Sequence, residues 1–358
     1  MDRAREGRER GSSAVMQQRK PTSFDIAQRA GVSQPTVSRA LRGDPNVSEA
    51  TRKRVKAIAA QLHYKVDKNA SSLRSRQSNT LALLFFEDDT PDDSLINPFY
   101  LAMLGSIARA CARRGYDLLT SLQQLSSDWH VDYEDSNKAD GIILLGYGDY
   151  ELYRARLEQL TAQGTHFVRW GSVRGDQPGV TVGCDNIRGG FDAAAHLIGL
   201  GRQRIAFIGQ ANSHYPEIED RYRGACNAMR AGGITPDPAL VEPALTTEQS
   251  GYEAAQRLIA RNRAFDALFA ASDLIAIGAL RALEEAGISV PEQVSVVGFD
   301  DIAAAALAHP PLTTIAQDLG QAGELLVATL LGQIDGRAVP PVMLPPRLVV
   351  RRSTAAIG

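Results

Sequence analysis

From Thr80 onward, short apolar runs alternate with amphipathic helical patterns, and no other feature restricts the possible folds as much. The runs lie at residues 81–86, 142–145, 205–208, 267–269 and 294–297. Each is followed by a helical or loop segment, which predicts an α/β fold with parallel sheets covered by helices on both faces. About 280 residues are available, enough for two such lobes. Ligands of these folds bind beyond the carboxyl ends of the strands, so the loops there are the expected site.

The charge of the chain is unevenly distributed. Residues 1–78 hold 17 Lys and Arg against 7 Asp and Glu, whereas the rest holds 22 against 34. The net charge of -2 therefore hides a basic head on an acidic body, which is typical of a protein that binds a polyanion. Residues 1–20 are predicted to be a disordered extension, and either Met1 or Met16 starts the protein. The larger share of the positive charge follows Thr22, where the sequence is patterned.

Several classes of protein are disfavoured by the composition. The three cysteines, Cys111, Cys184 and Cys226, are far apart and lack nearby histidine spacing, so neither a disulfide framework nor a metal site is expected. The start of the chain is charged, and no stretch has the length of a membrane span. We expect a cytoplasmic protein without cofactor or membrane contact.

Residues 22–62 hold three short helical patterns separated by turn signals. The first runs from Ser23 to Ala30 and closes at Gly31, a residue suited to a left-handed C-cap. Ser33 caps the second, and Ser48 caps the third. The third helix carries an apolar stripe, which consists of Val55, Ile58, Ala59 and Leu62. Residues 21–68 are thus predicted to form a small helical domain.

Two of these helices, joined by a three-residue turn, match a helix-turn-helix, whose second helix enters the major groove of DNA. The predicted base contacts are Gln34, Pro35 and Arg39, since Gln matches the edge of adenine and Arg that of guanine, each worth about 1 to 3 kcal/mol of discrimination. The predicted phosphate contacts are Thr22, Ser33, Ser38, Asn46, Ser48 and Thr51. An alternative remains for Ser33 and Ser48, which can cap helices whether or not DNA is bound.

Residues 22–41, TSFDIAQRAGVSQPTVSRAL, together with Val47-Ser48, Thr51-Arg52 and residues 62–64, resemble the N-terminal signature of the LacI/GalR family of bacterial regulators. The resemblance continues through the body, at residues 97–99, 140–143, 185–186, 189–190, 196–197, 200–201, 204–208, 221, 224, 295–302 and 310–314. It implies an all-α helix-turn-helix head and a two-lobed body like the periplasmic sugar-binding proteins.

The resemblance also implies a division of the chain into parts. Residues 69–78 would be a hinge, and residues 79–358 would bind the effector and form the dimer. The first lobe would take residues 79–182 and 313–340, and the second lobe 183–312 and 341–358. The chain ends shortly after its apparent last strand, residues 348–350, which leaves no room for a C-terminal leucine heptad helix. A homodimer is therefore expected rather than a tetramer.

In the family, the hinge enters the minor groove of the operator and wedges a leucine between base pairs. The resemblance assigns this role to Ala70 and Leu73, and a solitary apolar residue in a polar segment suits such a wedge. Residues 66–67, Val-Asp, replace the usual Pro-Asn, and Ser71 stands where Arg is frequent. The expected operator is double-stranded DNA with an inverted repeat and a flexible central step.

For the effector, the resemblance assigns Arg221 to grip two ligand oxygens and Asp300 to accept from two hydroxyls. Ser272 occupies a position where the family usually has Asn, and Gly171 one where an acidic residue is common. The predicted apolar platform is Trp170, at the end of a strand, with Phe99 and Tyr100 as weaker candidates. Aromatic side chains are more often core, and that alternative stays open.

The sequence thus predicts a transcriptional repressor with a small-molecule effector, most simply a sugar that acts as inducer of carbohydrate-utilisation genes. A corepressor-dependent regulator is the alternative, in which the effector strengthens DNA binding instead of weakening it. A sugar receptor without DNA function is a further alternative, but it leaves the basic head unexplained. No enzyme is predicted. Asp300 and Asp301 resemble a catalytic carboxylate pair, but adjacent residues at the end of a strand point apart.

Overall fold

The computed structural model describes residues 21–62, 64, 77–86, 96–122, 128–146, 148–261 and 264–357. The chain divides into two compact units, residues 1–75 and 76–358, called the head and the body below. The predicted extension, residues 1–20, lies outside the described residues. So does most of the predicted hinge, including Ala70 and Leu73.

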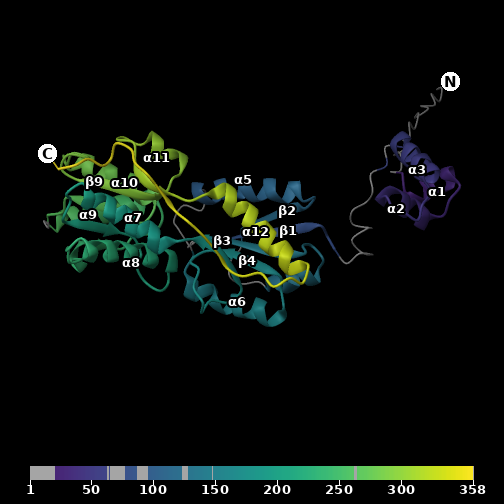
Figure 1. Ribbon diagram of the computed structural model, residues 1–358, viewed down its shortest axis with the longest axis horizontal. Coiled ribbons are helices and arrows are strands. Elements are labelled where there is room, and N and C mark those ends of the chain that lie inside the picture. The colour runs from purple at the N-terminus through teal and green to yellow at the C-terminus, as the bar shows by residue number, and fades with distance from the viewer. Residues whose placement is uncertain are drawn as a thin grey trace, which may run out of the picture. The chain divides into compact units, whose positions relative to one another are not determined.

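The head is built from three helices, α1 (Ser23–Ala30), α2 (Gln34–Arg42) and α3 (Glu49–Gln61), as predicted (Figure 1). Helix α1 ends at Gly31, whose φ of 64° is the left-handed conformation that glycine adopts without a steric penalty. Apolar side chains from all three helices form one small core. Its buried members are Ile26, Ala27, Ala30, Val37, Ala40, Val47, Val55 and Ala59.

The body contains two six-stranded sheets. The first has the order β11-β5-β4-β3-β1-β2, and all its neighbouring strands are parallel. Its strands are β1 (Thr80–Phe86), β2 (Asp117–Leu122), β3 (Gly141–Gly146), β4 (Phe167–Trp170), β5 (Val180–Cys184) and β11 (Val342–Leu344). Helices α5 (Pro98–Arg113) and α12 (Leu319–Ile334) pack together, and α6 (Tyr150–Gln163) and the π-helix η1 (His130–Asp135) also belong to this first lobe.

Burial on both faces of the first sheet follows the alternation of side chains along its strands. On β1, Leu81 and Leu83 pack in the core that contains α5 and α12. Ala82 and Leu84 pack in a second cluster with α6 and η1. A continuous apolar run is therefore what a strand covered on both sides requires.

The second sheet has the order β12-β10-β9-β8-β6-β7 and is parallel except at one edge. Its strands are β6 (Ile205–Ile208), β7 (Val241–Glu242), β8 (Ala267–Ala270), β9 (Ser295–Asp300), β10 (Thr313–Ala316) and β12 (Arg347–Val349). The strand expected at residues 348–350 is β12, which pairs antiparallel with β10 at the edge of this otherwise parallel sheet.

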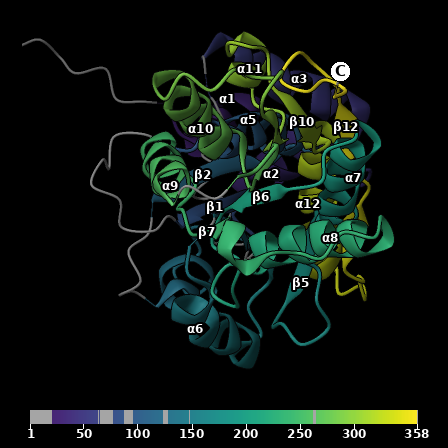
Figure 2. The ribbon, with the colours of Figure 1, turned by 90° about the vertical axis from the view of Figure 1, so that its left-hand side faces the viewer.

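The helices of the second lobe pack in pairs against this sheet. They are α7 (Asn186–Gly199), α8 (Pro216–Ala231), α9 (Glu248–Ala260) and α10 (Asp273–Glu285), with the short α11 (Ala303–Leu307) and the 3₁₀ turn η2 (Pro238–Leu240). Figure 2 shows the pair of α7 and α8 and the pair of α9 and α10 on opposite sides of the sheet.

The predicted lobe boundaries are wrong in two places. Strand β10, expected in the first lobe, pairs with β9 in the second sheet, whereas β11, expected in the second lobe, pairs with β5 in the first. The chain therefore passes between the lobes three times, after β5, between β10 and α12, and between β11 and β12. The two short strands β11 and β12 lie on opposite sides of the third crossing, which a sequence pattern of three-residue strands does not reveal.

Close contact between α7 and α8 depends on glycine. A Cβ added at Gly190 would collide with the backbone carbonyl of Arg221, and one at Gly224 with the carbonyl of Ile187. The two glycines let the helix backbones touch, which brings the start of α7 beside Arg221 on α8.

Among the described residues, no helix is both long and apolar enough to cross a membrane.

Candidate functional site

The exposed face of α2 carries the three predicted base contacts. Gln34, Pro35 and Arg39 are exposed, while Val37 and Ala40 on the other face are buried in the core of the head. The side-chain amide of Gln34 donates to the hydroxyl of Ser23, 2.7 Å away, which links the starts of α1 and α2. The three side chains thus share the exposed face of α2, with Gln34 held against the start of α1.

Three of the predicted phosphate contacts, Thr22, Ser33 and Ser48, lie at helix starts. The Ser33 hydroxyl accepts from the backbone N–H of Thr36 at 3.4 Å, and that of Ser48 accepts from Thr51 at 3.3 Å. The capping role left open for both serines is therefore confirmed. Thr22 precedes α1, and its backbone N–H donates to the carboxylate of Asp25 at 2.7 Å. The positive ends of helix dipoles lie at such positions, where a phosphate is favourable.

Ser38 and Thr51 are half-buried, and Asn46 is exposed with its backbone N–H donating to the Asp44 carboxylate at 2.9 Å. Contact with DNA at these positions stays a prediction, as it does for Ala70 and Leu73 outside the described residues.

In the body, Arg221 lies at the centre of a polar network beyond the ends of β8 and β9. Its side chain is 1% exposed. Nε donates to the side-chain oxygen of Asn186 at 2.9 Å, and Nη1 donates to the carbonyl of Ala271 at 2.6 Å. The guanidinium carbon lies 3.7 Å from the centroid of the Phe299 ring. Three groups thus fix the plane of the guanidinium.

Asp300, at the end of β9, faces the same network. Its Oδ1 lies 3.6 Å from Nη2 of Arg221 and accepts from the side-chain amide of Gln317 at 2.7 Å. Asp301 instead pairs with Arg351 at 2.6 Å, so the two neighbouring carboxylates point to different partners, as expected. The φ angles of Asp300 and Asp301 are 110° and 55°, and such strained backbone gathers at functional sites.

A third carboxyl group, Asp273, is fully buried nearby and was not singled out from the sequence. It accepts from the backbone N–H of Ile302 at 2.9 Å and hydrogen-bonds the Thr314 hydroxyl at 2.5 Å. Burial raises the pKa of Asp273 well above its usual value, and the negative charge of Asp300 raises it further. This buried region therefore holds Asp273, whose pKa is raised, beside the pair of Arg221 and Asp300.

Ser272, a predicted effector contact, is buried and caps α10. Its hydroxyl accepts from the backbone N–H of Ile275 at 3.3 Å, which leaves its hydrogen to donate elsewhere. The residues that the sequence reading missed, Asn186 and Gln317, support Arg221 and Asp300 from α7 and from the segment after β10. Asn186 belongs to the segment 185–186 that resembles the family, but its partner Arg221 is 35 residues away in the sequence.

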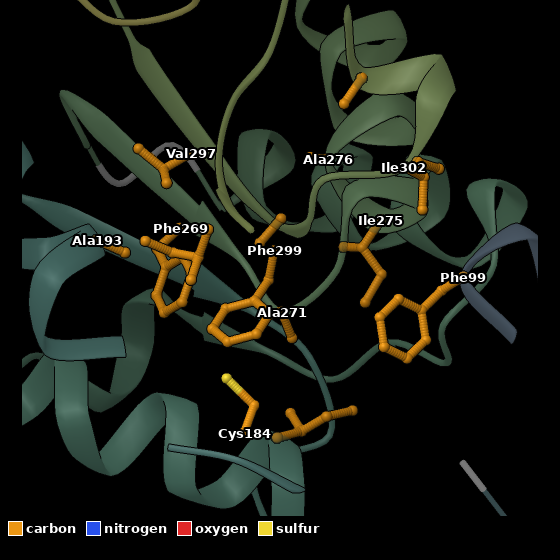
Figure 3. Packing of buried hydrophobic residues seen from close by; sticks show 14 of the residues in the cluster. Phe99, Cys184, Ala193, Phe269, Ala271, Ile275, Ala276, Val297, Phe299 and Ile302 are labelled. Atoms are coloured by element: carbon orange, nitrogen blue, oxygen red, sulfur yellow. The ribbon is translucent and has the colours of Figure 1, made fainter. Parts of the chain in front are cut away.

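The three predicted aromatic contacts lie together in the first lobe. The rings of Phe99 and Trp170 are 6.3 Å apart between centroids, and those of Phe99 and Tyr100 are 5.3 Å apart in an edge-on arrangement. All three are buried in a core cluster that includes residues of both lobes. Figure 3 shows Phe99 among second-lobe residues of this cluster, such as Ile275 and Phe299. They are core residues here, and a role as ligand platform stays a prediction.

Arg169, next to Trp170 on β4, is a buried cation that the sequence reading treated as part of an apolar run. Its guanidinium carbon lies 5.7 Å from the centroid of the Tyr150 ring, and its Nε has no hydrogen-bond partner among the described residues. A Cβ added at Gly171 would lie 2.8 Å from Oε1 of Glu217 and 3.1 Å from Nη1 of Arg169. A carboxylate of the second lobe, that of Glu217, thus lies against position 171.

Comparison with known proteins agrees with both parts of the chain. Residues 24–67 match the family described as bacterial regulatory proteins, lacI family, and residues 194–354 match the periplasmic binding protein-like domain. The HTH-type transcriptional regulator DegA of Bacillus subtilis (strain 168) is 32% identical over 95% of this chain and 99% of its own length.

Two solved structures have the same architecture. A complex of the transcriptional regulator CelR with cellobiose is 32% identical, with a TM-score of 0.70 over 93% of this chain and 99% of its own. The Lac repressor dimer bound to operator and the anti-inducer ONPF is 26% identical, with a TM-score of 0.80 over 94% of this chain and 100% of its own. With its helix-turn-helix head and two-lobed body, the chain belongs to the LacI family of bacterial regulatory proteins.

Proposed function

We propose that this protein is a sequence-specific repressor that binds an inverted-repeat operator as a homodimer and is released by a sugar. The observation that carries the proposal is the buried network of Arg221, Asp300 and Asn186 in a body joined to a helix-turn-helix head. Such a chain acts on DNA in the cytoplasm.

The head supports the DNA-binding half of the proposal. Arg39 and Gln34 lie on the exposed face of α2, and the caps of α1, α2 and α3 present backbone N–H groups to phosphates. Base contacts specify the sequence and phosphate contacts position the helix. A two-fold dimer places two heads on two half-sites, which is why the expected operator is an inverted repeat. The operator-bound Lac repressor dimer is a relative with this arrangement.

The body supports the sugar. A sugar offers neighbouring hydroxyls and an apolar C–H face, which require a forked donor, a carboxylate and an aromatic surface. Arg221 and Asp300 supply the first two at the ends of β8 and β9, and Trp170 with Phe99 supplies the third from the opposite lobe. The relative CelR was solved with cellobiose, a disaccharide. A corepressor of the same chemistry would reverse the response of DNA binding and use the same residues.

Regulation follows from two states of the body. An effector that prefers one arrangement of the lobes shifts the dimer away from the arrangement that holds the heads at half-site spacing. The coupling free energy expected for such a shift is about 1 to 3 kcal/mol. We propose no catalysis, because the carboxyl groups of Asp300 and Asp273 are engaged with Gln317 and Thr314.

The test is a titration of the full-length protein with glucose, cellobiose, maltose and ribose, followed by tryptophan fluorescence. Each titration is run with and without an operator selected from a random DNA pool. A saturable change with one sugar that also weakens DNA binding supports the proposal. DNA binding with no response to any sugar in a wider panel would contradict the sugar assignment and leave the repressor assignment intact. An effector that strengthens DNA binding would establish the corepressor alternative.

A further inference from the structure

A second set of contacts joins the two lobes away from the Arg221 network. The loop after β4, in the first lobe, meets the first half of α8, in the second lobe. The backbone N–H of Ser172 donates to Oε1 of Glu217 at 2.7 Å, and the Ser172 hydroxyl makes a short hydrogen bond to Asp220. The guanidinium of Arg174 donates to Asp220 at 2.7 Å, to Glu219 at 2.9 Å and to the carbonyl of Pro216 at 3.0 Å.

Ser172, Glu217 and Asp220 are buried, whereas the side chains of Arg174 and Glu219 are 24% and 36% exposed. Ser172 is 1% exposed, Asp220 5% and Glu217 7%. An exposed pair contributes little, whereas a buried carboxylate that loses its partner is strongly destabilised. Separation of the lobes at this point therefore costs free energy, unless water molecules replace the lost hydrogen-bond partners of Glu217 and Asp220.

The sequence fits this close approach. A Cβ at Gly171 would lie 2.8 Å from the carboxylate of Glu217, so any larger residue there would displace the Glu217 side chain. In the sequence, residues 217–220 resemble the exposed acidic start of an ordinary helix, and only the contact with the opposite lobe distinguishes them.

The contact also adjoins both halves of the proposed effector site. Asp220 immediately precedes Arg221 on α8, and successive side chains of a helix point about 100° apart. One turn of α8 thus holds the first lobe through Asp220 and the Arg221 network of the second lobe through Arg221. On the other side, Gly171 and Ser172 directly follow Trp170, so the contact fixes the distance between the aromatic surface and the guanidinium.

We propose that Ser172, Arg174, Glu217 and Asp220 form a latch that holds the two lobes together before any effector binds. They are positioning residues, which act through Arg221 and Trp170. The inference deepens the proposed function and rests on it in treating the facing surfaces of the lobes as an effector site. The latch itself is tested without effector.

The test measures amide hydrogen exchange at a different contact between the same lobes. The backbone N–H of Tyr150 donates to the carbonyl of His214 at 2.8 Å, across the lobes and outside the latch. The N–H of Ile142 donates to the carbonyl of His166 at 2.9 Å, within the first lobe. Opening of the lobes exposes the first amide and leaves the second protected.

We expect Arg174→Gln and Asp220→Asn, each in the full-length protein, to accelerate exchange of the Tyr150 amide about tenfold, with the Ile142 amide unchanged. The double variant should exchange more slowly than the product of the two single effects predicts, because both substitutions remove the same interaction. Arg188→Gln is the matched control. Arg188 pairs with Asp192 on its own helix at 2.7 Å, so neither amide should change.

Unchanged exchange of the Tyr150 amide in Arg174→Gln would overturn the latch. If Asp220→Asn accelerates both amides, the first lobe itself is destabilised in that variant, and Arg174→Gln alone decides the question. A latch that fails while the sugar titration succeeds leaves the repressor proposal standing. A latch confirmed without any sugar response leaves only the effector unidentified.

Discussion

The guanidinium of Arg221 lies flat against the ring of Phe299, with its carbon 3.7 Å from the ring centroid. The ring covers one face of the guanidinium, and Asn186 and Ala271 occupy two of its donors at the edge. Nη2 of the same guanidinium lies 3.6 Å from Oδ1 of Asp300. Because the Arg221 side chain is already held in place, it loses little conformational entropy when a ligand binds to it.

Replacement of Arg221 by Lys should separate charge from geometry. Lysine keeps the positive charge and lacks the fork, so we expect at least tenfold weaker affinity for the sugar that responds in the wild-type titration, about 1.4 kcal/mol or more. DNA binding in the absence of sugar should persist. The measurement is the fluorescence titration together with an operator-binding assay. Sugar affinity equal to that of the wild type would remove Arg221 from the site.

Replacement of Asp273 by Asn should change how stability depends on pH. In the folded protein the pKa of Asp273 is raised well above the ordinary 3.8, so the native state keeps a proton that the unfolded chain releases. The free energy of unfolding of the wild type therefore falls as the pH rises from about 3.8 toward the folded pKa, with a limiting slope of about 1.4 kcal/mol per pH unit.

Asparagine resembles the protonated acid, because its amide can donate to the Thr314 hydroxyl and its oxygen can accept from Ile302. The variant should thus gain stability relative to the wild type as the pH increases. Urea unfolding from pH 4 to pH 8 measures this difference. A difference that is flat or shrinks with pH would show that Asp273 is ionised in the folded state.

The close contact of α7 and α8 gives a paired prediction on glycine. Gly190→Ala should destabilise the body by about 2 kcal/mol or more, since the added methyl collides with the backbone of Arg221. It should also weaken the sugar response by moving Arg221. Gly199→Ala, on the same helix, is the control, because nothing lies within 4 Å of its added Cβ. Thermal unfolding compares the two, and equal melting temperatures would contradict the packing argument.

The recognition helix can be tested apart from the body. Arg39→Gln should weaken binding to the selected operator by about 1 to 3 kcal/mol and relax the preference at one base pair of each half-site. Arg29→Gln removes an exposed charge from α1, outside the recognition helix, and should lower affinity more evenly across sequences. Selection of operators from a random DNA pool with each variant measures the change in base preference. Identical sequence preferences for Arg39→Gln and wild type would exclude a base contact by Arg39.

Features of local origin could be predicted from the sequence. The left-handed turn at Gly31 and the caps at Ser33 and Ser48 depend on residues three or four positions away, and all three were expected where the structure has them. The assignment of Arg221 and Asp300 to the effector site followed from the family resemblance; Asp300 lies at the end of β9, and Arg221 lies on α8.

What could not be predicted depends on partners far apart in the chain. Asp273 meets Thr314 across 41 residues, and Ser172 meets Asp220 across 48. Strand β2 has the burial pattern of a half-exposed edge rather than a continuous apolar run, and β11 has only three residues. Periodicity identifies neither the pairing of such strands nor the sheet to which they belong.

The three crossings between the lobes affect the order in which the protein can be completed during synthesis. The ribosome releases most of the first lobe early, yet α12 and β11, which cover and extend its sheet, come from residues 319–344. Helix α12 packs on β3, β4 and β5. The apolar side chains on that face of the first sheet therefore stay exposed until nearly the whole body has been synthesised. All helices of the second lobe, from α7 to α11, precede α12 in the chain, so they are synthesised before the first lobe is complete. We therefore expect the second lobe to pack first and the first lobe to fold beside it.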